Sequence, residues 1–215
     1  MLKILIADDH KILREGLKAI LRERESFEVV GEAANGREAV SKAKKLAADV
    51  VIMDIAMPGL NGIEATRRIR RYSSRIKVVI LSMYNSREYV LEALKAGAMA
   101  YLRKETASKE LLQAIDKVTR GEIYLEDVHS QYVIDEFRNA TQPSERSLLN
   151  NLTSREREIL QMVAEGKSNK SVAGILNLSL KTVETHRQNV MKKLSAHNVV
   201  SLVKFAIRTG LVKLD

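Results

Sequence analysis

Five short apolar runs alternate with five longer segments of helical spacing over the first 120 residues. The runs span residues 2–7, 29–33, 50–53, 78–81 and 99–102. The segments after them span roughly 10–23, 36–47, 61–71, 86–96 and 108–120. Leu13, Leu17 and Ile20 show the spacing of a buried helix face. Strands alternating with helices in this way predict an α/β unit, a parallel five-stranded sheet with helices on both faces.

The rest of the chain has a different pattern. Residues 121–150 are acidic and include a loop-like stretch at 139–144, and we interpret them as a linker in which 126–138 is a candidate helix. Residues 151–215 are helical in pattern throughout, with predicted N-caps at Thr153, Ser168 and Ser179. The expected organisation is therefore an α/β domain at 1–120, a linker at 121–150 and an all-α four-helix domain at 151–215.

Composition excludes several classes of protein. The chain is 45% hydrophobic and 29% charged, which is typical of globular domains. It has no cysteine, so disulfides and thiolate metal sites are excluded, and a reducing cytoplasm fits. The first apolar run ends at Asp8 and Asp9, too early for a signal peptide. A transmembrane helix needs a run of about 18 apolar residues, and the sequence contains no such run. We therefore expect no membrane partner.

The net charge of +9 is unevenly distributed. Residues 151–215 hold 11 basic and 5 acidic side chains, a net charge of +6 in a short segment. A basic module suits a polyanion such as DNA. Charge alone fits a solvated lysine-rich surface equally well.

Polar residues interrupt the apolar runs at the ends of the expected strands. Asp8 and Asp9 end the first run, Asp54 the third and Ser82 the fourth, and Lys104 follows the fifth by two residues. The carboxyl ends of parallel strands share one edge of a sheet, where ligands bind at the point of strand-order reversal. We therefore expect these five side chains to converge.

Their chemistry is that of a phosphoryl-transfer site. Three carboxylates in one place repel each other, and a divalent cation removes that repulsion. Oxygen-only ligands, with no cysteine or histidine expected nearby, favour a hard ion such as Mg²⁺. Lys104 and Ser82 can bind the remaining oxygens of a phosphoryl group, with a carboxylate as the nucleophile. Taken singly, each residue has an ordinary structural role as a helix cap or a surface group.

These residues also lie in motifs that resemble the receiver domain of two-component systems. The match covers residues 1 to about 120 and includes 8–10, 53–62, 81–83 and 100–104. The resemblance implies a flavodoxin-like (βα)5 fold in which Asp54 accepts phosphate from a sensor histidine kinase. It implies that Asp9, Asp54 and the Ala56 carbonyl bind Mg²⁺, with Asp8 assisting through water.

The same resemblance assigns the remaining polar residues. Ser82 and Lys104 contact the phosphoryl group, and Tyr101 is an aromatic switch that turns inward with Ser82. Without the resemblance, Tyr101 is an amphipathic ring expected to be half-buried at a sheet edge. We interpret His10 as a surface residue at a helix start, because no second histidine lies at metal-ligand spacing.

The sequence pattern predicts a helix at 168–176, a tight turn and a second helix at about 180–194. The outward face of the second helix mixes charged groups with hydrogen-bonding groups that suit base edges and phosphates. A helix presented in this way fits the major groove. Periodicity alone slightly favours an ordinary amphipathic helix with a solvated face.

The segment 150–212 resembles the LuxR-type helix-turn-helix of the NarL/FixJ regulators, through residues 152–160, 165–170 and 181–187. The resemblance implies base contacts from Glu184, Thr185 and Gln188. It places a homodimer contact on the last helix, about 197–209. It implies phosphate contacts on double-stranded DNA from Asn169, Lys170, Lys181, Thr182, Arg187 and Lys192.

Together these features predict a DNA-binding response regulator. In this family the resting receiver often covers the recognition helix, and phosphorylation releases it and favours dimers. A regulator whose receiver is silent or responds to a ligand is the alternative. A second alternative is an enzyme, a Mg²⁺-dependent phosphatase with an aspartyl intermediate. Such phosphatases generally need a second acid two residues after the nucleophile, where this chain has Ala56. We therefore expect no enzyme activity beyond the chain's own phosphorylation and slow dephosphorylation.

Overall fold

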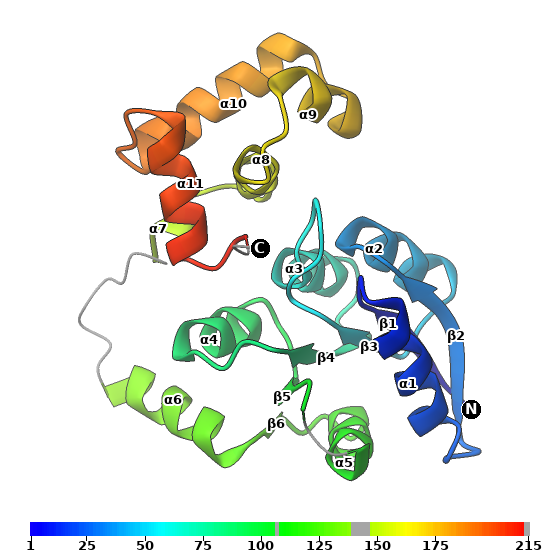
Figure 1. The fold of residues 1–215 in the computed structure, drawn as a ribbon. Helices are drawn as coiled ribbons and strands as arrows, with labels where there is room; N and C mark the ends of the chain where they lie inside the picture. Colours follow the sequence, from blue (N-terminus) through cyan, green and yellow to red (C-terminus); the bar gives the residue numbers. More distant parts are fainter. Residues whose placement is uncertain (106–107, 139–146, 213–215) are drawn as a thin grey trace. The chain divides into compact units, whose positions relative to one another are not determined.

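The computed structural model describes residues 1–105, 108–138 and 147–212 (Figure 1). The chain divides into two compact units, Met1–Ala140 and Thr141–Asp215. Each unit has its own hydrophobic core and is considered by itself. Within the described residues, no helix is both long enough and apolar enough to span a membrane.

A parallel sheet forms the centre of the first unit. Its strand order is β2-β1-β3-β4-β5-β6, and all pairs are parallel. The order reverses between β1 and β3, which is where an open sheet of this kind forms a crevice. The strands are β1 (Leu2–Ala7), β2 (Phe27–Ala33), β3 (Val50–Met53), β4 (Lys77–Ser82), β5 (Ala100–Arg103) and β6 (Tyr124–Leu125).

Helices cover both faces of this sheet, as the apolar runs predict. Alternate residues of β1 enter different cores: Ile4 and Ile6 face one, and Leu5 faces the other. The first core includes residues of α1 and α5, and the second includes residues of α2, α3 and α4. The helices are α1 (Lys11–Leu21), α2 (Gly36–Lys45), α3 (Gly62–Tyr72), α4 (Arg87–Lys95) and α5 (Ser108–Thr119).

In the part of the chain that the structure describes, the sheet has six strands rather than the five expected. β6 has only two residues, too few to give an alternating pattern, and it pairs with β5 at Ala100 and Tyr101. Helix α6 (Asp127–Arg138) follows β6 and packs beside α4. The candidate helix at 126–138 is therefore present, and the first compact unit includes it. Figure 1 shows α6 on the α4 side of the sheet.

The second unit is helical, with α7 (Ser147–Asn150), α8 (Ser154–Ala164), α9 (Asn169–Leu176), α10 (Leu180–Lys193) and α11 (Val199–Arg208). The last four are the helices expected from sequence. Thr153 and Glu156 form the predicted capping box at the start of α8. Asn177 adopts a left-handed conformation, with φ of 51°, that ends α9 and gives the tight turn before α10.

The buried face of α11 differs from the expected one. The sequence pattern favours a buried face made of Val199, Leu202, Val203, Ala206 and Ile207. The structure instead buries Leu202, Phe205 and Ala206, leaves Val203 and Ile207 partly exposed, and leaves Val199 38% exposed. Phe205 joins the core cluster of α8 and α10, because its larger ring fills that space.

Candidate functional site

Two acidic residues meet where the sheet reverses its strand order. Asp8 follows β1 and Asp54 follows β3, and these strands pair directly. The backbone N–H of Asp54 donates to the carbonyl of Ala7 at 2.8 Å, which extends the ladder to the ends of both strands. Asp8 and Asp54 are each only 2% exposed. The parallel sheet therefore holds both carboxylates in a pocket with little water.

Lys104 lies between these carboxylates. Its Nζ is 2.7 Å from Asp8 Oδ2 and 2.9 Å from Asp54 Oδ2, and its side chain is 7% exposed. It is placed there because its backbone N–H donates to the Ser82 carbonyl at 2.9 Å, continuing the β4–β5 pairing. One ammonium thus faces two buried carboxylates, which leaves this trio one negative charge in excess.

The pKa shifts follow from this imbalance. Burial raises the pKa of Asp54; Lys104 opposes that rise and Asp8 adds to it. Burial alone would lower the pKa of Lys104, but the neighbouring Asp54 and Asp8 carboxylates raise it above its usual value. Lys104 therefore stays charged, and the ionised form of Asp54 is disfavoured unless further positive charge arrives.

The acidic cluster has the donors that a hard cation needs. Ligand atoms of Asp8, Asp9, His10 and Asp54 all lie within 4.8 Å of one another. The side chain of Asp9 is 33% exposed, so the cluster opens to solvent on that side. Ala56 is half-buried in the loop after β3, and its backbone hydrogen-bonds the Asp54 carboxylate.

His10 lies at the start of α1, as expected, with a side chain 58% exposed. Its backbone N–H donates to Asp8 Oδ1 at 2.8 Å. Its Nδ1 is 3.1 Å from Asp8 Oδ1 and 2.8 Å from Asp9 Oδ1. His10 therefore contacts the acidic cluster, whereas the sequence interpretation gives it only a surface position at the helix start.

The second unit presents the residues expected to contact DNA on α9 and α10. Val172 and Val183 are fully buried and fix these two helices against α8. Arg187 Nη1 donates to Asn169 Oδ1 at 3.3 Å, so the two helices also share a polar contact on their outer side. Six of the nine residues are exposed: Lys170, Lys181, Glu184, Thr185, Gln188 and Lys192. The other three, Asn169, Thr182 and Arg187, are partly exposed.

Comparison with protein families matches both units. Residues 4–116 match the response regulator receiver domain, and residues 150–206 match the luxR family of bacterial regulatory proteins. The transcriptional regulatory protein LiaR of Bacillus subtilis is 38% identical over 213 residues, covering 99% of this chain and 100% of LiaR. The oxygen regulatory protein NreC of Staphylococcus epidermidis is 37% identical over 217 residues, with the same coverage.

Solved structures agree with these matches. The RcsB response regulator of Salmonella typhimurium is 26% identical with a TM-score of 0.57, covering 95% of this chain and 98% of that one. A structure of an RcsB–DNA complex, also 26% identical, gives a TM-score of 0.59, covering 95% of this chain and 96% of that one. Both units and nearly the whole length are therefore shared with these regulators. The chain belongs to the NarL/FixJ family of two-component response regulators.

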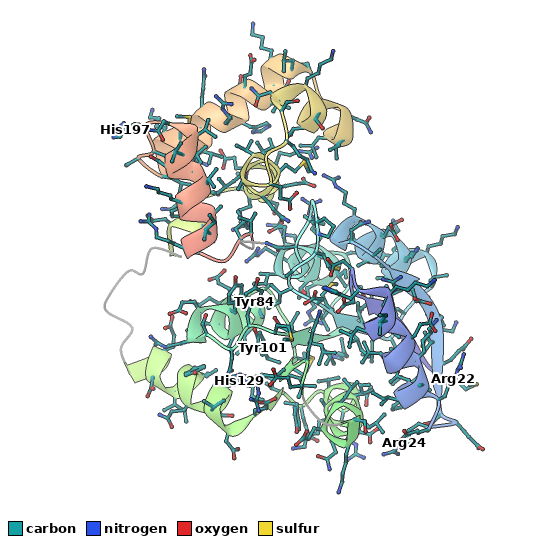
Figure 2. The ribbon with its side chains drawn as sticks, in the orientation of Figure 1. Arg22, Arg24, Tyr84, Tyr101, His129 and His197 are labelled. Carbon is teal, nitrogen blue, oxygen red and sulfur yellow. The ribbon has the colours of Figure 1, made fainter. Side chains whose placement is uncertain are left out.

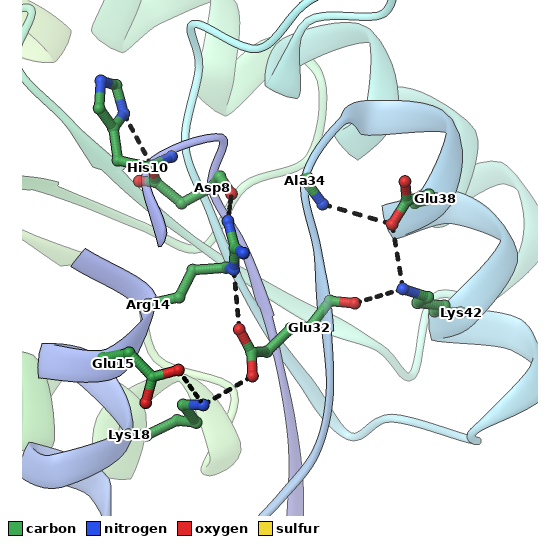
Figure 3. Close-up of polar contacts among 9 residues, drawn as sticks. All are labelled: Asp8, His10, Arg14, Glu15, Lys18, Glu32, Ala34, Glu38 and Lys42. Atoms are coloured by element: carbon green, nitrogen blue, oxygen red, sulfur yellow. Dashed lines mark hydrogen bonds and ion pairs between the residues drawn. The ribbon is translucent and has the colours of Figure 1, made fainter. Parts of the chain in front are cut away.

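A polar network supports the acidic pocket of this response regulator, and sequence reasoning missed it. Arg14 Nη1 donates to the Asp8 carbonyl at 2.7 Å, and Arg14 Nε donates to Glu32 at 2.8 Å (Figure 3). Lys18 also contacts Glu32 at 2.7 Å, and these contacts lower the pKa of Glu32. Lys42 donates to the Glu32 carbonyl from α2. The network ties α1, β2 and α2 to the backbone of Asp8.

On the other side of the pocket, the regulator's expected switch residues form a chain of contacts. Ser82 is fully buried, and its Oγ accepts from the Tyr84 backbone N–H at 3.1 Å. The Tyr101 hydroxyl donates to the Tyr84 carbonyl at 2.8 Å. Tyr101 is fully buried rather than half-buried, because β6 and α6 add cover that the five-stranded prediction lacks.

Proposed function

We propose that this response regulator is switched by phosphorylation of Asp54, and that the switch controls its binding to double-stranded DNA. The observation that carries the proposal is the meeting of Asp54, Asp8 and Lys104 in one buried pocket at the strand ends. A desolvated carboxylate beside a lysine has the surroundings of a nucleophile for phosphoryl transfer. The receiver corresponds to 1–120, the connecting segment to 121–150 and the DNA-binding domain to 151–215.

Mg²⁺ fits the donor set of this pocket. The cluster offers oxygens from three carboxylates beside the His10 ring, and carboxylate oxygens are the ligands that Mg²⁺ prefers. In this proposal Asp9, Asp54 and the Ala56 carbonyl hold the ion, and Asp8 assists through water. When bound, the ion would neutralise charge on the pocket and on the incoming phosphoryl group.

The chain's own residues carry the transfer. An oxygen of Asp54 forms a bond to phosphorus as the nitrogen–phosphorus bond of a kinase phosphohistidine breaks. Lys104 and Ser82 contact the transferred oxygens, and Lys104 balances their charge. Later attack by water on phosphorus breaks its bond to the Asp54 oxygen, releases inorganic phosphate and slowly restores the carboxylate. We propose no further catalytic turnover, since the apolar Ala56 stands where an aspartyl phosphatase needs its second acid.

Binding to DNA belongs to α9 and α10. In this proposal Glu184, Thr185 and Gln188 contact bases, and the surrounding basic and polar residues contact phosphates. Their exposure supports these roles. A homodimer would place two such helices on paired half-sites. A sensor histidine kinase is the phosphoryl donor, as the two-component family requires.

Phosphorylation of the full chain by acetyl phosphate tests the site. The wild type in Mg²⁺ should gain one phosphoryl group, measured by intact mass, and Asp54→Asn should gain none. Asp49→Asn is a matched control, because Asp49 is an exposed carboxylate just before β3. Uptake of phosphate by Asp54→Asn would show that the phosphoacceptor is another residue.

DNA binding then tests the output. Affinity across a genomic DNA library should rise when the chain is phosphorylated, and Asp54→Asn should lose this dependence. Equal affinity in both states would instead favour a regulator that binds DNA without phosphorylation. The two experiments therefore separate the receiver from the DNA-binding role.

A further inference from the structure

Helix α6 buries a histidine against the expected aromatic switch. His129 is fully buried, and its ring lies 5.0 Å from the Tyr101 ring at 78°, an edge-to-face contact. Its Nε2 hydrogen-bonds Asn85 in the loop between β4 and α4. Tyr132, one turn further along α6, lies 6.1 Å from the His129 ring. Figure 2 shows Tyr84, Tyr101 and His129 close together.

These contacts continue the chain of hydrogen bonds from the phosphoacceptor pocket. Ser82 binds the Tyr84 N–H, and the Tyr84 carbonyl binds the Tyr101 hydroxyl. Tyr101 then contacts His129 through its ring. The path from a strand end in the pocket to α6 thus consists of direct contacts between four residues.

Ion pairs hold this part of the chain to α4 and to β5 more weakly. Glu136 pairs with Arg87 at 2.9 Å and Lys95 at 3.0 Å, both on α4. Arg103 pairs with Glu126, just before α6, at 2.9 Å. Partly exposed ion pairs such as these contribute little to stability. The contacts of His129, by comparison, are buried and touch Tyr101 directly, so they depend on the orientation of that ring.

We propose that His129 is a positioning residue that couples the buried orientation of Tyr101 to the docking of α6. The proposal rests on the switch proposed above. A phosphoryl group that draws Ser82 toward it favours the inward orientation of Tyr101, and that orientation forms the surface on which His129 packs. Phosphorylation then tightens α6, and α6 in turn favours phosphorylation, because coupling between two sites is reciprocal. The segment leading to the DNA-binding domain thereby responds to the state of Asp54.

Hydrogen exchange in the full chain tests the coupling without any substitution. Exchange of the 127–136 amides is compared in Mg²⁺ alone and in Mg²⁺ with beryllium fluoride, a phosphoryl mimic. We expect α6 exchange to slow by about fivefold or more, the lower end of coupling between sites. Unchanged α6 exchange, with the loop after Asp54 protected by the mimic, overturns the inference. Absence of any protection near Asp54 instead contradicts the proposed phosphoacceptor site.

Substitution of His129 separates coupling from simple packing. His129→Leu retains apolar bulk but loses the Asn85 hydrogen bond, and it should abolish the dependence of α6 exchange on beryllium fluoride. It should also weaken the binding of beryllium fluoride by about fivefold, because coupling between binding equilibria is reciprocal. Gln131→Ala is the matched control, since Gln131 is exposed on the same helix. It should behave as the wild type.

A double-mutant cycle with Tyr101→Leu completes the test. If His129 acts through Tyr101, His129→Leu should add no further loss of mimic dependence in the Tyr101→Leu background. The coupling is refuted if beryllium fluoride slows α6 exchange as much in His129→Leu as in the wild type. It is also refuted if the two substitutions reduce that slowing in a strictly additive way. If His129→Leu fails to fold, the comparison of α6 exchange in the wild type with and without beryllium fluoride still tests the coupling.

Discussion

Replacement of Lys104 by methionine gives the sharpest test of the buried pocket. Asp8 and Asp54 are each 2% exposed, and the ammonium of Lys104 lies within 2.9 Å of both. Methionine retains much of the side-chain length but no charge. The trio then changes from one excess negative charge to two. Nothing else about the packing of the strand ends needs to change.

The expected cost is large because the remaining charges are buried. Removing one partner of a buried ion pair costs about 3–5 kcal/mol. For a unit of this size, each kcal/mol lowers Tm by about 2–4 °C, so the loss is about 6–20 °C. Asp54→Asn in the same background should recover about 2 kcal/mol, because it restores the original charge balance.

The assay is urea unfolding of the full chain in a chelator, followed by tyrosine fluorescence. The chain has no tryptophan, and all six tyrosines lie in the first unit, so the signal reports that unit alone. Added Mg²⁺ should restore more stability to Lys104→Met than to the wild type. Lys109→Met, at an exposed lysine, is the control and should change stability by less than about 0.5 kcal/mol.

The pH dependence gives a second check. Burial already raises the pKa of Asp54, and the loss of Lys104 removes an opposing influence. A carboxyl whose folded pKa exceeds its unfolded pKa binds protons preferentially in the folded state. The difference in unfolding free energy between the wild type and Lys104→Met should therefore shrink as the pH falls. The reasoning would be refuted if Lys104→Met lowered the unfolding free energy by less than about 1 kcal/mol at neutral pH, or by the same amount with and without Asp54→Asn.

Three further substitutions test the polar network, the loop after β3 and the DNA-binding surface. Arg14→Ala removes the donor to the Asp8 carbonyl and should weaken Mg²⁺ binding by about tenfold, measured by Mg²⁺-dependent stabilisation; unchanged affinity would count against the network. Gly62→Ala places a Cβ 1.9 Å from the Asp54 carbonyl oxygen and should destabilise the first unit by at least about 3 kcal/mol in urea unfolding. Lys170→Ala should weaken DNA binding equally across sequences and reduce the salt slope by about one, which a titration of binding against salt measures.

The sequence is most informative where topology forces residues together. Parallel strands share an edge for their carboxyl ends, so Asp8, Asp54 and Lys104 converge although they are far apart in the chain. The short apolar runs predict the strands well because burial on both faces leaves little room for polar residues. The N-caps at Ser168 and Ser179 are likewise local, and the structure confirms both.

Features that depend on tertiary packing escape sequence reasoning. β6 is two residues long and has no periodicity of its own. Arg14 and Glu32 are 18 residues apart, and nothing in either segment indicates that they meet. His129 lies in an acidic segment that reads as a linker, and only the packing of α6 on the sheet buries it. The face of α11 shifts toward Phe205 because the shape of the core, rather than periodicity, decides which side chain fits.

The burial of Asp54, rather than its acidity, is what suits it to the switch role that we propose. A phosphoryl group adds nearly two negative charges, and on an exposed residue such as Asp49 salt would screen them within about 8 Å. In the pocket, the trio with Lys104 already has an excess negative charge and little water, so added charge must be balanced by a cation or by movement of nearby groups. Ser82 accepts two backbone hydrogen bonds, one from the Lys104 N–H to its carbonyl and one from the Tyr84 N–H to its Oγ. A displacement of Ser82 therefore reaches Tyr101 through hydrogen bonds rather than through a screened field.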